Sequence, residues 1–142
     1  MELRECELGQ LLINEQSPAQ RVLLREKGGR RALAMDIGMV EALAINNGLQ
    51  EGNAPRPLTH DLLLGVMRAL GGQLERAVVN DMAALAIGGV TFLAVLEIST
   101  DDGRRQLVDC RPSDALALVV RTGCPLFVSE KVLAAAGTEE PL

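Results

Sequence analysis

Residues 90–133, VTFLAVLEISTDDGRRQLVDCRPSDALALVVRTGCPLFVSEKVL, decide the fold class of this chain. In chain order they predict a strand, a turn, a returning strand, a helix, a short extended segment and a second helix, at residues 90–98, 101–103, 104–109, 112–122, 125–128 and 130–136. The first strand alternates and is rich in β-branched residues, and an Asp-Asp-Gly turn joins it to its partner. Ser129 is placed to cap the last helix. Strands and helices in mixed order, with hairpins, predict an α+β fold with a mixed sheet.

The N-terminal half supports the same class. Its predicted strands cover residues 3–13, 20–26, 31–37 and 73–81, and its predicted helices cover residues 38–47 and 59–70. The turn Lys27-Gly28-Gly29-Arg30 makes a hairpin of two of these strands, and Gly48 is placed to end the first helix. We therefore expect one compact α+β domain over residues 1–137, a mixed β-sheet with hairpins packed against three to four helices, and a short tail over residues 138–142.

The composition narrows the range of functions. A chain of 142 residues and 15.2 kDa is the size of one ordinary domain. Only Phe92 and Phe127 are aromatic, which excludes a base-stacking platform for nucleic acid. The net charge of -5 makes the chain a poor passive coat for a phosphate backbone. The net charge does not exclude a nuclease function, because a local basic patch or a metal ion can bind the phosphate.

The cysteines and the apolar runs predict a cytoplasmic protein that does not enter the membrane. Cys6, Cys110 and Cys124 are odd in number and form no CxxC motif, as expected in a reducing compartment. The N-terminal residues carry charges where a signal peptide has its apolar stretch. The longest uncharged run, residues 82–96, is too short to span a bilayer and is broken by two glycines.

The apolar content also predicts a homo-oligomer, most simply a two-fold dimer. Leu, Ala and Val are abundant for one small domain, and the predicted strand at residues 90–98 has few polar positions. Part of this apolar surface is therefore expected to lie between subunits.

Two predicted helix starts share one pattern. Each has Arg-Pro, a hydroxyl residue, an Asp and then an apolar helical run, as in RPLTHD (residues 56–61) and RPSD (residues 111–114). Capping explains the Pro, the hydroxyl residue and the Asp. It does not explain Arg56 and Arg111, because a cation is unfavourable at a helix N-terminus. Each Arg either pairs with a carboxylate or binds phosphate beside the exposed helix N–H groups.

The same segments resemble the bifunctional nuclease family. PRPLTHDLLLGVMRALG (residues 55–71) and VDCRPSDALALVVRTGCPLFVSEKVL (residues 108–133) are similar to its two signature stretches. MDIGMVEALAINNGL (residues 35–49) resembles the family's Ile-Gly-x-x-Glu-Ala helix entry. The similarity covers about residues 24–134, although Asp36 and Leu93 stand where the family has a Trp and a Tyr. The resemblance implies a compact α+β domain with DNase and RNase activity.

Phosphodiester hydrolysis needs an activated water and charge neutralisation, which carboxylates holding Mg²⁺ or Mn²⁺ supply. The candidate catalytic residues are His60, Asp61, Asp109 and Asp114, the candidate substrate-binding residues are Arg56, Thr59, Arg111 and Ser113, and the candidate metal ligands are Glu41, Asp61 and Asp114. His60 is the only imidazole and so the only unperturbed acid or base that titrates near neutral pH.

Each candidate also has a structural explanation. The aspartates are also explained as caps, His60 as a first-turn residue bonded to backbone, and the arginines as partners of Asp side chains. Two hypotheses follow: a metal-assisted nuclease acting on DNA or RNA, and a non-catalytic regulatory or scaffolding domain that has structural Arg–Asp pairs or binds a small anion. We further expect Arg56 and Arg111 to lie in one polar cluster with the three aspartates.

Overall fold

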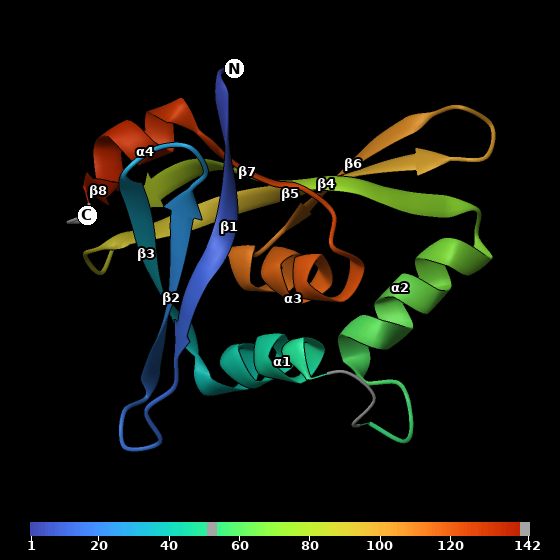
Figure 1. Ribbon diagram of the computed structural model, residues 1–142, viewed down its shortest axis with the longest axis horizontal. Coiled ribbons are helices and arrows are strands. Elements are labelled where there is room, and N and C mark those ends of the chain that lie inside the picture. The colour runs from blue at the N-terminus through green and yellow to red at the C-terminus, as the bar shows by residue number, and fades with distance from the viewer. Residues whose placement is uncertain (51–53, 140–142) are drawn as a thin grey trace.

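A computed structural model describes residues 1–50 and 54–139 of the chain. Within these residues eight strands form one sheet in the order β6-β5-β4-β7-β1-β2-β3-β8 (Figure 1). The strands are β1 (Leu3–Leu12), β2 (Ala19–Glu26), β3 (Arg31–Gly38), β4 (Gly72–Ala84), β5 (Val90–Thr100), β6 (Arg105–Cys110), β7 (Leu126–Ser129) and β8 (Thr138–Glu139). Only the β4–β7 pair is parallel among the described pairs, so the sheet is mixed, as predicted.

The two predicted hairpins are confirmed. β2 and β3 pair antiparallel around Gly28, and β5 and β6 pair antiparallel around Gly103. Both glycines have a positive φ, +70° and +82°, which other residues rarely adopt. Local turn chemistry therefore sets both strand pairings.

Four helices complete the described fold: α1 (Met39–Leu49), α2 (Thr59–Ala69), α3 (Pro112–Thr122) and α4 (Glu130–Ala136). Figure 1 shows α1, α2 and α3 together on one side of the sheet and α4 on the other. The central helix is α3, which packs against α1, α2, β4 and β5 and has four successive fully buried residues at positions 115–118. These four elements are thus held in place by their packing against the buried helix α3. Ser129 caps α4 as predicted, since its Oγ accepts the Val132 N–H at 3.2 Å.

Two expectations from the sequence are corrected. Gly48 does not end α1 but lies inside it, and the helix ends at Leu49. Thr138 and Glu139, which we had assigned to a tail, form β8 and pair with β3. Residues 51–53 of the predicted loop and residues 140–142 of the tail lie outside the described part of the chain.

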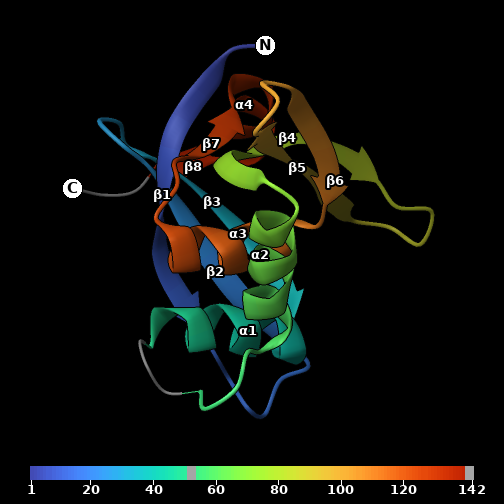
Figure 2. The same cartoon turned by 90° about the vertical axis from the view of Figure 1, so that its right-hand side faces the viewer.

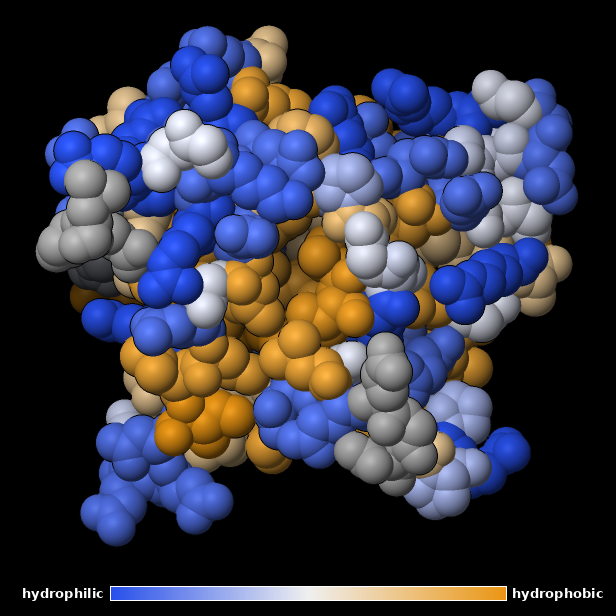
Figure 3. Space-filling view, in the orientation of Figure 1, coloured by the Kyte–Doolittle hydropathy of each residue, from blue (hydrophilic) through white to orange (hydrophobic). Residues whose placement is uncertain are grey.

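Most side chains of the apolar stripe of α2 lie outside the hydrophobic core. The helical periodicity of Leu62, Leu63, Val66 and Leu70 predicts the helix correctly, yet these four side chains are 42% to 80% exposed. Only Leu64 of α2 is buried. A second apolar area lies in the middle of the face seen in Figure 3, bordered by polar side chains. Among the described helices, none has the length and apolar character needed to cross a membrane.

Candidate active site

Arg111 and Asp114 form a bidentate pair at the start of α3. Arg111 is the N-cap residue, and its Nε and Nη2 donate to the two Asp114 carboxylate oxygens at 2.9 and 3.0 Å. The third nitrogen, Nη1, donates to Glu41 Oε2 at 3.3 Å. Glu41 lies in the first turn of α1, so the guanidinium joins the starts of two helices. The side chain of Arg111 is nevertheless 62% exposed and can reach a ligand in solvent.

His60 brings the start of a third helix to the same carboxylate. It lies in the first turn of α2, and its Nε2 is 3.1 Å from Asp114 Oδ1. The hydrogen bonds from Arg111, and then that from His60, lower the pKa of Asp114 below its usual value. An ionised carboxylate only accepts hydrogen bonds, so Nε2 of His60 is the donor to Asp114, and in the neutral imidazole the free lone pair is on Nδ1.

This cluster lies beside an open groove of about 1010 Å³. Residues of α1, α2, α3, β5 and β6 line the groove, and Figure 2 shows α2 and β6 on the same side of the molecule with α1 below them. Its polar lining includes His60, Arg111 and Asp114, whereas its walls include exposed apolar residues such as Leu63, Val66 and Val108. The groove therefore offers a charged end and an apolar wall to one ligand.

Asp61 belongs to a different cluster. Its Oδ1 accepts from Nε of Arg121 at 2.7 Å, and its Oδ2 accepts the Leu58 N–H at 2.9 Å. The Leu58 N–H and the Arg121 guanidinium together lower the pKa of Asp61. Arg121 is only 7% exposed, and its Nη1 also donates to the carbonyls of Ala44 and Ala117 at 2.9 Å. It thereby links α1, α2 and α3 from within.

Gly48 makes room for this link. A Cβ atom at position 48 would lie 2.6 Å from Arg121 Nη1 and 2.6 Å from a methyl group of Val120, which is closer than real Cβ contacts. The glycine is thus required for close approach of α1 to α3 and not for a helix end. The sequence analysis assigned Gly48 to a helix end and did not identify Arg121. A basic residue in the last turn of α3 was the one available signal for Arg121.

The other predicted site residues are not brought into the cluster. Arg56 is exposed and makes no ion pair within the described part of the chain. Thr59 is not a cap, because α2 has Leu58 as its N-cap and Asp61 bonds that residue's N–H. Ser113 is only 6% exposed, which leaves it little contact with a substrate. Asp109 lies near the end of β6, is exposed, and has no ion-pair partner among residues 1–50 and 54–139.

The predicted metal ligands do not form a cage. No group of three or more His, Cys, Asp or Glu side chains among the described residues is arranged to hold an ion. Arg111 lies between Glu41 and Asp114, and Asp61 is paired with Arg121. The described residues therefore do not fit the carboxylate site for Mg²⁺ or Mn²⁺ that the sequence predicts.

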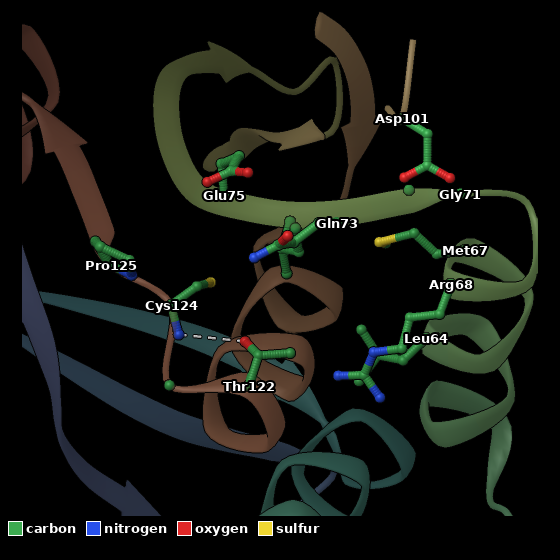
Figure 4. A pocket seen from close by; sticks show the side chains of 13 residues that line it. Leu64, Met67, Arg68, Gly71, Gln73, Glu75, Asp101, Thr122, Cys124 and Pro125 are labelled. Carbon is green, nitrogen blue, oxygen red and sulfur yellow. Dashed lines mark hydrogen bonds between the residues drawn. The ribbon is translucent and has the colours of Figure 1, made fainter. Parts of the chain in front are cut away.

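The three cysteines pack in the apolar core or against it. Cys6, Cys110 and Cys124 are free thiols, and burial raises the pKa of Cys110 to about 12, with the Asp114 and Asp109 charges adding to the shift. Cys110 lines the groove but is a neutral thiol at physiological pH. Cys124 lies in a second pocket of about 610 Å³, where its N–H donates to Thr122 Oγ1 at 3.2 Å (Figure 4). None of the predicted site residues lines this second pocket.

Three helix starts are joined by the Arg111–Asp114 pair, because Glu41 contacts Arg111 and His60 contacts Asp114. Together with the mixed sheet they define the class: a one-domain α+β protein with a polar cluster that opens onto a groove. Residues 22–141 match the Bifunctional nuclease domain. The chain belongs to this family, which confirms the resemblance seen in its sequence.

Two similar relatives are known from Mycobacterium tuberculosis. Uncharacterized protein Rv1829 of strain ATCC 25618 / H37Rv and Uncharacterized protein MT1877 of strain CDC 1551 / Oshkosh are each 42% identical to the chain over 116 residues. The alignments cover 82% of this chain and 65% of each relative. The chain thus spans about two thirds of the length of these relatives, whose names assign no activity.

Proposed function

We propose that this chain is a nuclease that hydrolyses phosphodiester bonds of DNA or RNA, with His60, Arg111 and Asp114 as its catalytic cluster. The observation that supports this function most is the 3.1 Å contact of His60 with Asp114 beside the groove, in a chain of the bifunctional nuclease domain family. A carboxylate that orients an imidazole is a recurring arrangement for proton transfer at neutral pH.

His60 acts as the general base in this proposal. Asp114 holds Nε2–H, so Nδ1 accepts a proton from a water molecule in the groove. The resulting hydroxide forms the new P–O bond, the bond to the leaving oxygen breaks, and that oxygen takes a proton from solvent. Asp114 stays ionised throughout, because Arg111 holds its pKa below the usual range.

Arg111 neutralises the phosphate in this proposal. Its guanidinium is exposed and presents a planar set of N–H donors, which suits phosphate oxygens. The family resemblance implies both DNA and RNA as substrates. With two aromatic residues in the chain, we expect the backbone phosphate, and not base stacking, to supply most of the binding.

A second candidate function follows from the groove itself. All three polar groups of the cluster are satisfied by one another, and much of the groove wall is apolar. These features also suit a non-catalytic binding or scaffolding domain in which the Arg–Asp pair is structural.

The test is hydrolysis of labelled single-stranded and double-stranded DNA and RNA by purified chain. Each substrate is incubated with Mg²⁺, with Mn²⁺ and with chelator, so that the same experiment decides whether a cation is needed. Arg111→Met should lower cleavage by at least about tenfold, equal to about 1.4 kcal/mol of transition-state stabilisation. Arg104→Met is the matched control, because Arg104 is also an exposed arginine paired with an Asp, at 2.8 Å, and does not line the groove. Absence of cleavage in every arm favours the binding domain.

A further inference from the structure

The β6 strand is an open edge of the sheet. It stands at one end of the strand order and pairs on one side only, with β5. Its register with β5 has no irregularity. An open edge strand presents unpaired N–H and C=O groups, which another strand can pair with.

The main-chain groups that point to this open edge can be identified. The Thr100 N–H donates to the Arg104 carbonyl at 2.9 Å, so these two residues form a hydrogen-bonded pair. Hydrogen-bonded pairs alternate along an antiparallel ladder. The even-numbered residues of β6 therefore bond β5, and the main chains of Arg105, Leu107 and Asp109 point outward.

We propose that two copies of this chain pair their β6 strands antiparallel about a two-fold axis that passes through Leu107. This register places Leu107 opposite its own counterpart and Arg105 opposite Asp109 of the other copy. All three outward-pointing residues then exchange main-chain hydrogen bonds with the second copy. The interface is isologous, as a two-fold axis requires.

Charge complementarity selects this register. Asp109 has no ion-pair partner among the described residues, and Arg105 is 69% exposed with only a 3.4 Å contact to Glu97. Directly opposed residues of opposite charge stabilise a strand pair, and like charges destabilise it. Shifting the axis by one residue to Val108 would place Leu107 opposite Asp109 and leave the arginine without its partner.

The apolar surface beside β6 supplies the rest of the interface. Leu107 is 66% exposed and Val108 is 42% exposed, on opposite faces of the strand. Val108 lines the groove together with exposed side chains of α2, which Figure 2 shows on the same side of the molecule as β6. An edge pair alone is smaller than the roughly 800 Å² that each partner buries in a typical stable interface. The exposed stripe of α2 is the apolar surface that a second copy would cover.

Sedimentation of the purified chain over a concentration series tests this dimer. The wild type should sediment at twice the 15.2 kDa of one chain. Arg105→Asp and Asp109→Arg should each raise the dissociation constant by at least about tenfold, whereas the double charge reversal should restore the dimer. Leu107→Arg places two arginines together at the axis and should give a monomer. Ile87→Arg is the control, since Ile87 is 95% exposed in the turn between β4 and β5.

Three results would overturn the proposal: a wild type that stays monomeric, a dimer that Leu107→Arg leaves intact, or a double charge reversal that does not restore the dimer. Hydrogen exchange of the wild type gives an answer that does not depend on the variants folding. The Leu107 N–H should become more protected as the protein concentration rises, and equal exchange at all concentrations contradicts the pairing.

Discussion

At the scale of single residues, Asp114 is the group on which the candidate site depends. It accepts hydrogen bonds from Arg111 and from His60, and thereby fixes the side chains of two different helices. Breaking a buried Arg–Asp pair would cost about 3–5 kcal/mol, because one buried charge would be left unpaired. The guanidinium is instead 62% exposed, so water can solvate it when its partner is lost.

Asp114→Asn should therefore affect activity much more than stability. Loss of the charge should lower hydrolysis by at least about tenfold, while exposed ion pairs contribute only about 1 kcal/mol or less to the free energy of unfolding. Parallel denaturant unfolding and cleavage assays check this. Asp81→Asn, which breaks an Asp–Lys pair outside the groove, is the control. A large fall in stability with unchanged cleavage would assign Asp114 a structural role.

Arg121 has the opposite character, because it is buried and holds three helices together. Arg121→Ala should lower the free energy of unfolding by about 3–5 kcal/mol, since Asp61 is left without its charged partner and two carbonyls lose their donor. Arg68→Ala, an exposed arginine of α2, should change it by less than about 0.5 kcal/mol. Urea unfolding of the two variants measures the difference, and equal midpoints would contradict this role for Arg121.

At the scale of elements, α2 shows how a helix start differs from the simplest pattern. Thr59 precedes the apolar run as a cap residue would, but the cap position falls one residue earlier, on Leu58. A leucine side chain cannot accept a hydrogen bond, so the carboxylate of Asp61 bonds the Leu58 N–H and takes over part of the capping.

Two alanine substitutions separate these roles. Thr59→Ala should change the free energy of unfolding by less than about 0.3 kcal/mol, because Thr59 is exposed and caps nothing. Asp61→Ala should cost at least about 1 kcal/mol, because it removes the bond to the Leu58 N–H and the partner of Arg121. Denaturant midpoints measure both changes. A larger loss of unfolding free energy for Thr59→Ala would show that Thr59 caps the helix.

The elements that local chemistry determines were predictable from the sequence. The hairpin turns around Gly28 and Gly103 and the start of α3 at Pro112 follow from neighbouring residues. The two Arg-Pro helix starts were also recognised as sites of charged residues. Partners distant in the chain were not predictable: Asp61 pairs with Arg121, 60 residues away, and not with nearby Arg56. Gly48 was misassigned because a close helix contact and a helix end both favour glycine.

The exposure of the apolar stripe of α2 was not predictable for a related reason. Periodicity shows that a helix has an apolar face, but it does not show whether that face meets this chain or another one. The described fold covers α1 and α3 more completely than α2, and much of the apolar face of α2 borders the groove. This remaining apolar surface agrees with the expectation of a dimer, which stays a prediction.

At the scale of the whole molecule, several paired carboxylates make the free energy of unfolding depend on pH. Main-chain donation and Arg121 lower the pKa of Asp61, Arg111 lowers that of Asp114, and Arg31 lowers that of Glu26. A carboxyl with a lower pKa in the folded chain binds fewer protons than in the unfolded chain. Its stabilising contribution is therefore present above the unfolded pKa and is lost as the pH falls through the folded pKa.

The free energy of unfolding should accordingly fall as the pH is lowered below about 4, the ordinary pKa of these carboxyl groups. Urea unfolding at neutral pH and at a series of acidic values measures it. Asp61→Asn should show a shallower acid dependence than the wild type, because it removes one of the titrating groups. A free energy that stays constant below that pH would contradict the pairing described above.

The proposed hydrolysis depends on proton transfer by His60. The most direct test compares multiple-turnover cleavage of one labelled oligonucleotide by the wild type and by His60→Gln, which keeps a hydrogen-bond donor for Asp114 but cannot titrate. The account predicts a rate at least about 100-fold lower for His60→Gln at neutral pH, with an unchanged melting temperature. Equal cleavage by the two proteins, or none by the wild type, would contradict it.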